Sequence, residues 1–234
     1  MAFKIKNWKL ALLSLVFFCL FISLGCWQLS RAEQKKILLD SFAERTRKQP
    51  LSTLELIQTK DPRFYRARLE GRFDNEHTLL LDNKTFRGQI GYEVYTPFNA
   101  IGLNLPILVD RGFIPIGQTR KQLPAIASIQ GSVTLSGMLN LPPTYVSWGK
   151  IHESTQINWP LRVQFINLPE LSSLLGHPLY SQILNITPND PAAYSVEWKV
   201  VIMGPEKHRA YAVQWFALAL TLLILFVALN RRSL

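Results

Sequence analysis

Two stretches of twenty residues without a formally charged side chain, residues 10–29 and 210–229, constrain this 234-residue chain more than any other feature. Twelve residues of the first stretch and eleven of the second are Leu, Ile, Val or Phe. A twenty-residue helix, rising about 1.5 Å per residue, spans the roughly 30 Å hydrocarbon core of a bilayer. Insertion of either stretch gains on the order of 3 to 7 kcal/mol. The sequence therefore predicts an integral membrane protein with two transmembrane helices.

A cleaved signal peptide is the alternative for the first stretch, because Lys4, Lys6 and Lys9 precede it. Its apolar core is longer than that of a typical signal peptide, and no small-x-small cleavage site follows. A lipoprotein signal ending at Cys26 is a further alternative, but Ser23 stands where Leu is expected. We therefore interpret residues 10–29 as a retained transmembrane helix.

Two spans place both chain ends on the same side of the membrane. Basic residues near the ends favour the cytoplasm for residues 1–9 and 230–234. They are Lys4, Lys6, Lys9, Arg231 and Arg232. Residues 30–209 then form one periplasmic domain, although Arg31, Lys35 and Lys36 weaken the charge contrast. A mitochondrial presequence does not fit into nine residues, so we expect a bacterial inner (plasma) membrane protein.

The net charge of +10 does not indicate nucleic acid binding. The excess flanks the spans, and no aromatic-basic motif accompanies it, so anionic lipid headgroups are the simpler partner. The only cysteines, Cys19 and Cys26, lie in the first span. The periplasmic domain therefore has neither a disulfide nor a cysteine-ligated metal site.

The domain is predicted to be α+β, mainly antiparallel and barrel-like. A helix continues or starts at Ser30, where the capping-box spacing to Glu33 occurs, and runs to about Lys48. Residues 49–59 form a short second helix or a loop, with Ser52 and Thr53 as candidate caps. Beyond Pro62, short runs separated by turn residues predict strands. The predicted strands are residues 64–73, 78–81, 91–97, 106–115, 132–139, 162–168 and 195–203. Residues 82–84 are a turn candidate, residues 169–176 a helix, and residues 142–160 an irregular loop.

No enzyme template fits the chain. The sequence has no Gly-rich phosphate loop, no G-x-S-x-G elbow and no H-E-x-x-H motif. His77, His152 and His177 are far apart, and each is interpreted as an exposed loop histidine. We therefore expect a protein that is not an enzyme.

The end of the first span carries Trp27, Gln28 and Arg31. The simplest interpretation is an interfacial Trp with an Arg that reaches the headgroups. The Gln28 amide still needs hydrogen-bond partners at this boundary, and the neighbouring helix is a natural source.

The second span opens with three residues at helical spacing, His208, Tyr211 and Trp215, which share one face. Ala212 and Ala219 are small enough for close approach to another helix. A histidine at the membrane edge is a candidate site residue, and imidazole is a common ligand of haem iron. An interfacial His among belt aromatics is the alternative.

Residues 109–115 place an acid and a base, Asp110 and Arg111, directly after an apolar run. Adjacent strand residues point to opposite faces, so the two side chains need not pair. Gly112 indicates a bulge or a positive φ angle. A structural role is the favoured interpretation.

Four motifs together resemble the surfeit-locus family of cytochrome c oxidase assembly factors. The family patterns are G-x-W-Q-x-x-R, G-Y-x-V-x-T-P, V-N-R-G-W-[IV]-P and N-N-H-x-x-Y-A-x-x-W-F. The corresponding segments here are residues 25–31, 91–97, 109–115 and 206–216. Asp110 replaces the family Asn, Phe113 replaces Trp, and Glu206-Lys207 stands where two Asn precede the His.

The resemblance implies a non-enzymatic assembly factor that assists haem a insertion into subunit one of a haem-copper oxidase, or stabilises that subunit. The implied partners are subunit one, other assembly factors and the lipid bilayer. The resemblance also implies transient haem a binding, with His208 as the iron ligand and Trp27, Gln28, Tyr211 and Trp215 around it. The alternatives are a haem-free, membrane-anchored interaction module and an unrelated periplasmic enzyme or sensor.

Overall fold

The computed structural model describes residues 7–117, 122–143, 151, 157–197 and 203–230. The chain divides into two compact units. One is helical and combines Met1–Ser41 with Lys199–Leu234, and the other is Phe42–Trp198.

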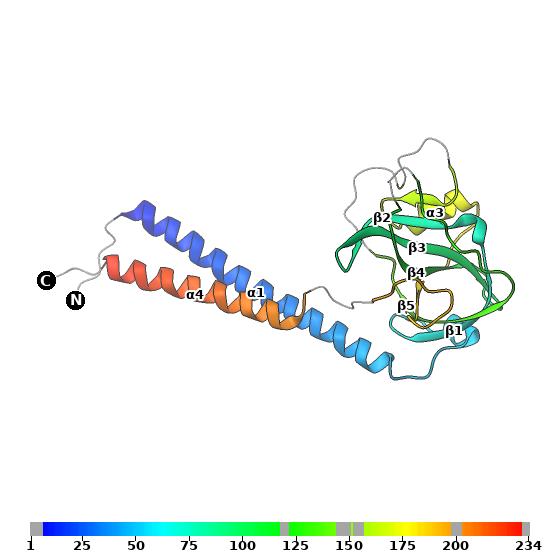
Figure 1. Cartoon of the computed structure of the whole chain (residues 1–234). Helices are drawn as coiled ribbons and strands as arrows, with labels where there is room; N and C mark the ends of the chain where they lie inside the picture. Colours follow the sequence, from blue (N-terminus) through cyan, green and yellow to red (C-terminus); the bar gives the residue numbers. More distant parts are fainter. Residues whose placement is uncertain (1–6, 118–121, 144–150, 152–156, 198–202, 231–234) are drawn as a thin grey trace. The chain divides into compact units, whose positions relative to one another are not determined.

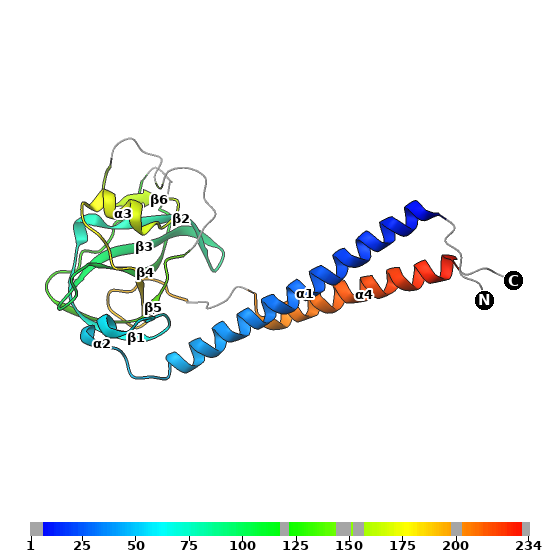
Figure 2. The ribbon, with the colours of Figure 1, turned by 180° about the vertical axis from the view of Figure 1, so that it is seen from behind.

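The helical unit contains most of α1 (Trp8–Arg45) and all of α4 (Pro205–Asn230), which run alongside each other in both views (Figures 1 and 2). Within the described residues, these two helices are long and apolar enough to cross a membrane. Only 6% and 11% of their most apolar windows are buried. Their large apolar side chains therefore face outward, as in helices surrounded by lipid and unlike the core helices of soluble proteins.

Helix α1 continues past the predicted end of the span without a break. It passes through Ser30, so the capping-box spacing there does not start a new helix, and it ends at Arg45. The next capping box is formed, because the Ser52 side chain accepts from Glu55 N and the Glu55 side chain accepts from Ser52 N. This box starts the short helix α2 (Thr53–Gln58) and confirms the predicted cap.

Small residues allow α1 and α4 to approach. Gly25 and Ala32 of α1 are buried, as are Ala212 and Ala219 of α4. A Cβ atom on Gly25 would lie only 2.5 Å from the Phe216 ring. The predicted role of the two α4 alanines is thus confirmed, and Gly25 supplies the matching space on α1.

Seven strands form one mixed sheet among the described residues of the second unit, in the order β1-β5-β7-β4-β3-β2-β6. Their bounds are β1 (Arg66–Phe73), β2 (Leu79–Phe86), β3 (Gln89–Ala100), β4 (Ile107–Pro115), β5 (Val133–Asn140), β6 (Leu161–Val163) and β7 (Ile183–Ile186). A 3-10 turn, η1 (Asn75–His77), and helix α3 (Leu168–Leu175) complete the unit. The pairings are antiparallel except β2–β6 and β4–β7, so the mainly antiparallel prediction is confirmed.

The long strand β3 closes the sheet into a barrel. One edge of β3 pairs with β4. Its other edge pairs first with β2, up to Tyr95, and then with β1, from Phe98 onward. Pro97, which has no N–H to donate, lies between the part of β3 that pairs with β2 and the part that pairs with β1. Strands β1, β5, β7, β4 and β3 therefore form a closed ring, onto which β2 and β6 are added.

Side chains that alternate along the strands between exposed and buried positions fill the interior of this ring. The inward residues of β1 are Ala67, Leu69 and Phe73, and they pack with Phe98 and Leu135 in one core cluster. A second cluster lies where α3 packs on the sheet through Leu171. Helix α3 begins after the Asn167 cap and ends at Gly176, whose φ angle is 76°. This agrees with the predicted helix over residues 169–176.

Several local predictions are wrong. Residues 82–84 are not a turn: β2 continues through them as a bulge, with Asn83 at a φ angle of 59°. The predicted strand over residues 162–168 is limited to β6, because α3 already begins at Leu168. Strand β7 was not predicted.

The last predicted strand is not formed at its described start. Ser195 makes only an isolated bridge to Phe113. Residues 198–202 of this prediction lie outside the described residues, as does most of the predicted loop over residues 142–160.

Candidate functional site

The helical unit brings two predicted site residues into direct contact across 180 positions of sequence. His208 Nδ1 of α4 lies 2.7 Å from Gln28 Oε1 of α1. The His208 side chain is buried, with 9% of the residue exposed. The Gln28 amide was expected to find a hydrogen-bond partner on the neighbouring helix, and that partner is His208.

Local sequence explains why the imidazole faces α1. Helix α4 begins at Pro205, a residue suited to a first turn because its missing N–H would have no helical partner. His208 is consequently in the first turn. Ala212 and Ala219 follow at four and eleven positions, on the same side of the helix, and are 1% exposed.

The hydrogen bond determines which imidazole nitrogen can bind a ligand. An amide oxygen only accepts, so Nδ1–H of His208 donates to Gln28 Oε1. In the neutral ring the lone pair is then on Nε2. A hydrogen bond that holds one ring nitrogen as donor while the other coordinates is the usual arrangement of metal-ligating histidines. The residues present thus fit an iron ligand with its supporting acceptor.

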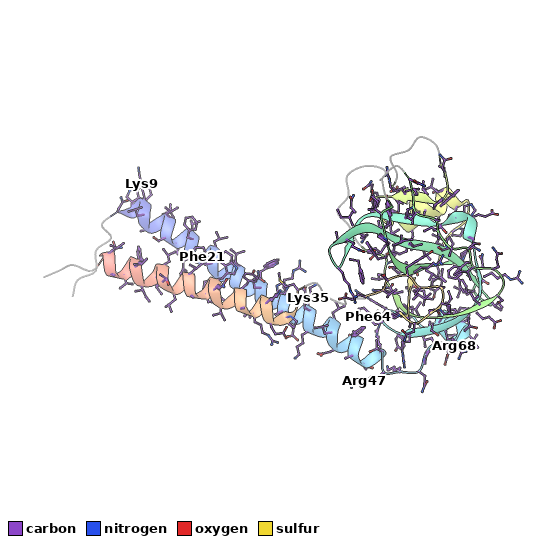
Figure 3. The ribbon with its side chains drawn as sticks, in the orientation of Figure 1. Lys9, Phe21, Lys35, Arg47, Phe64 and Arg68 are labelled. Carbon is purple, nitrogen blue, oxygen red and sulfur yellow. The ribbon has the colours of Figure 1, made fainter. Side chains whose placement is uncertain are left out.

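The aromatic side chains predicted for the site lie in different environments. The Trp215 ring stacks on Phe21 of α1, with ring centroids 5.8 Å apart. Phe21, labelled in Figure 3, is seven residues before Gln28 and therefore on the same side of α1. Trp27 and Tyr211 are about half exposed, at 50% and 44%. The Arg31 guanidinium lies 5.4 Å from the centroid of the Trp27 ring.

Phe21 was not singled out from sequence. The signal that points to it is its seven-residue spacing from Gln28, but the same apolar stretch contains many other large side chains. Only the position of Trp215 on the opposite helix distinguishes Phe21 from them.

The motif in β4 has a structural role. Gly112 has a φ angle of 99°, and the register shift opposite Val94 and Tyr95 leaves Arg111 as the extra residue of a bulge. The predicted bulge and positive φ are both confirmed. Asp110 Oδ1 accepts a hydrogen bond from Gly112 N at 3.0 Å, which ties the carboxyl group to the bulge.

Both charged side chains of this motif are buried. Arg111 donates through Nε to Ala192 O and through Nη2 to Ala127 O, and its guanidinium lies against the rings of Phe73 and Tyr194. Burial lowers the pKa of Arg111. The two side chains make separate contacts, as predicted, and the bulge is what moves Arg111 out of the regular ladder.

Burial also raises the pKa of Asp110 well above its usual value, and the nearby Glu93 carboxylate adds to this effect. A hydrogen bond from Tyr95 and the one from Gly112 act in the opposite direction. Lys84 forms a 3.0 Å ion pair with Glu93 beside them. These neighbours of Asp110 come from β2 and β3, and sequence reasoning did not identify them.

The other histidines do not converge on a site. His177 lies in the loop after α3 and contacts the Pro178 carbonyl, so its predicted loop position is confirmed, but its side chain is only partly exposed. The prediction is wrong for His77, which is part-buried in η1, with Nδ1 2.6 Å from Asp74 Oδ2. His152 lies outside the described residues. Among the residues that were described, no group of three His, Cys, Asp or Glu side chains could hold a metal ion.

Known proteins similar to this chain cover almost its whole length. The sequence profile of the SURF1 family matches residues 15–220. A SURF1-like protein of Rickettsia felis is 27% identical, over 95% of this chain and 97% of its own. Surfeit locus protein 1 of Gallus gallus is 24% identical, over 91% of this chain and 71% of its own. A SURF1-like protein of Monosiga brevicollis is 23% identical, over 90% and 83% respectively.

The matched region includes Gln28 and His208, the bulge motif of β4 and every strand of the barrel. Sequence motifs, the order of elements along the chain (a helix, a barrel, a helix) and the profile match agree with one another. The chain belongs to the SURF1 family.

Proposed function

We propose that this protein is an assembly factor for cytochrome c oxidase, which assists haem a insertion into subunit one or stabilises that subunit. The observation that carries the proposal is the hydrogen bond from His208 Nδ1–H to Gln28 Oε1. It leaves Nε2 available for iron, in a protein whose family membership and paired apolar helices favour work at the membrane. Haem a is the cargo in this proposal, and the chain itself is not an enzyme.

The residues around His208 suit a transient contact with an apolar, iron-containing group. Burial of the imidazole limits its exchange with water, and the stacked pair of Trp215 and Phe21 holds α4 against α1. Trp27 and Tyr211 are half exposed and can pack against a ligand or a partner. Because the helix pair leaves these rings open, the proposed partner, subunit one, would complete the enclosure.

The test compares His208→Ala with a matched histidine variant, His177→Ala, in a deletion strain that makes haem a. We expect the purified His208→Ala protein to lose haem and the strain to lose oxidase activity. The His177→Ala protein should retain both, because His177 lies in a loop of the other unit. Equal haem spectra and equal oxidase activity for His208→Ala and the wild type would refute the ligand role.

Gln28→Ala tests the supporting hydrogen bond. Loss of the acceptor that holds a metal-ligating histidine typically weakens metal binding by roughly 10- to 100-fold. We expect lower haem occupancy in Gln28→Ala at unchanged protein yield, and recovery in Gln28→Glu, whose carboxylate also accepts from Nδ1–H. Full occupancy in Gln28→Ala would contradict the orienting role.

A second candidate keeps the assembly role without haem. It is favoured by the exposure of Trp27 and Tyr211, since half-exposed aromatic residues beside a buried polar pair also suit contact with another membrane protein. Co-purification of subunit one with haem-free protein, together with normal function of His208→Ala, would support this candidate over the first.

A further inference from the structure

One face of β1 presents a row of arginine side chains to the outside. Residues of β1 alternate between exposed and buried, so Arg66, Arg68 and Arg72 all point outward, with Glu70 between the last two. We call the three arginines the arginine strip; Arg68 is labelled in Figure 3. Alternate residues of a strand are roughly 6.5–7 Å apart.

The arginine strip has few partners within its own unit. Arg66 donates through Nη2 to Lys48 O at 2.9 Å. Within the part of the chain that the structure describes, the side chains of Arg68 and Arg72 make no hydrogen bond or ion pair. Neighbouring β5 offers no countercharge either, because Met138, Ser136 and Thr134 lie opposite Arg66, Arg68 and Glu70.

Nearby carboxylates are already paired with other cations. Asp61 Oδ2 lies 2.7 Å from Arg45 Nη1, and Glu44 Oε1 lies 2.8 Å from Lys48 Nζ. These two acids therefore neutralise Arg45 and Lys48. The arginine strip keeps its excess positive charge.

The backbone of β1 is not available for adding another strand. Leu51 N donates to Arg66 O, Arg68 N donates to Leu51 O, and Ile101 N donates to Glu70 O. On the opposite edge, β5 pairs with β1 throughout residues 66–71. Recognition at this face must therefore use side chains.

We propose that the arginine strip is a docking surface for an acidic, extended segment of a partner protein. Guanidinium groups bind carboxylates through two parallel hydrogen bonds, and three acidic residues that are two and then four positions apart in an extended segment have the same spacing as the arginines. Glu70 repels a fourth carboxylate and so favours one register. Among the outward residues of β1 and β5 named above, Met138 is the one apolar side chain and none is aromatic, whereas surfaces that bind membranes usually combine basic residues with several apolar or aromatic side chains.

The test uses the full chain in nanodiscs of zwitterionic lipid and two labelled ten-residue peptides, one with Glu at positions 2, 4 and 8 and Ser elsewhere, and the other with Gln in place of each Glu. Fluorescence anisotropy measures binding to wild type, to Arg68→Glu/Arg72→Glu, and to the matched control Lys60→Glu/Arg87→Glu. Lys60 and Arg87 are exposed basic residues outside the strip, so the control carries the same change in net charge.

We expect the Glu peptide to bind wild type in a salt-dependent manner, and the strip variant to bind it at least about tenfold more weakly. The control should lose less than about threefold, and the Gln peptide should not bind. Equal weakening in strip variant and control would overturn the proposal, because it would show a response to net charge alone. The proposal would also be overturned if the strip variant lost the binding to anionic vesicles that wild type shows but bound the Glu peptide as wild type does. That result would indicate a lipid-binding surface.

Discussion

Asp110 and Arg111 are neighbours on β4, and both are only 2% exposed. Burial of charged groups is costly unless each finds partners. Arg111 finds two backbone carbonyls and two aromatic rings. Asp110 has the Gly112 N–H and the Tyr95 hydroxyl, but it also lies near the Glu93 carboxylate.

The raised pKa of Asp110 makes a prediction about stability and pH. Because burial favours the protonated acid, the folded state holds this proton at pH values where the unfolded chain releases it. Stability contributed by this group is therefore present below the unfolded pKa and is lost as pH rises toward the folded value. We expect Asp110→Asn to raise the thermal midpoint of the detergent-solubilised protein at pH 8, by roughly 2–4 °C for a gain on the order of 1 kcal/mol.

The difference between Asp110→Asn and wild type should shrink as pH falls and vanish at about pH 3, below the usual pKa of an Asp side chain, where both states of wild type are mostly protonated. Glu76→Gln is the control, because Glu76 is an exposed acid of the same unit. A lower midpoint for Asp110→Asn at pH 8, or a difference that does not change with pH, would contradict the assignment.

At the scale of elements, the bulge in β4 depends on one glycine. Gly112 combines a φ angle of 99° with a close approach to the chain after Tyr194: an added Cβ would lie 2.7 Å from Ser195 O. Both features exclude larger residues from the bulge. This explains why Arg111 can leave the regular ladder and turn into the interior.

Gly112→Ala should therefore destabilise the barrel more than an alanine at another positive-φ glycine. Gly131 has a φ angle of 79°, but nothing lies within 4 Å of its added Cβ. Gly131→Ala measures backbone strain alone, about 1–3 kcal/mol, and Gly112→Ala adds the clash with Ser195. We expect a thermal midpoint several degrees lower for Gly112→Ala than for Gly131→Ala, and equal midpoints would show that the clash is relieved without cost.

The whole molecule combines two kinds of structure that satisfy backbone hydrogen bonds in different ways. Helices α1 and α4 satisfy them internally, which suits a membrane, and the closed ring of five described strands satisfies them between strands. Orientation in the membrane stays a prediction, based on the basic residues at the chain ends.

Cysteine labelling can test this orientation, because both natural cysteines lie in the first span. In a variant with Cys19→Ala and Cys26→Ala, we introduce either Arg87→Cys in the exposed β2–β3 turn or Ser233→Cys at the chain end. A membrane-impermeant maleimide should label the first in intact bacteria and the second only after lysis. The reverse pattern would place the barrel in the cytoplasm.

The sequence alone determined those features that depend on neighbouring residues. Two uncharged stretches suffice for the apolar helices, because their length and hydrophobicity are local properties. The alternation in residues 64–73 suffices to indicate β1, and the helix predicted over residues 169–176 is α3 to within one residue at each end. The shared face of His208, Tyr211 and Trp215 likewise follows from helical periodicity.

Tertiary structure decided what depends on residues far apart. Strand β7 has only four residues, and it is a strand because β4 and β5 pair with it on both sides. Strand β3 closes the barrel because its first part pairs with β2 and its last part pairs with β1. No local sequence pattern predicts this change of pairing partner. His208 meets Gln28 across 180 residues because small side chains let the two helices approach, which is a property of the pair and not of either helix.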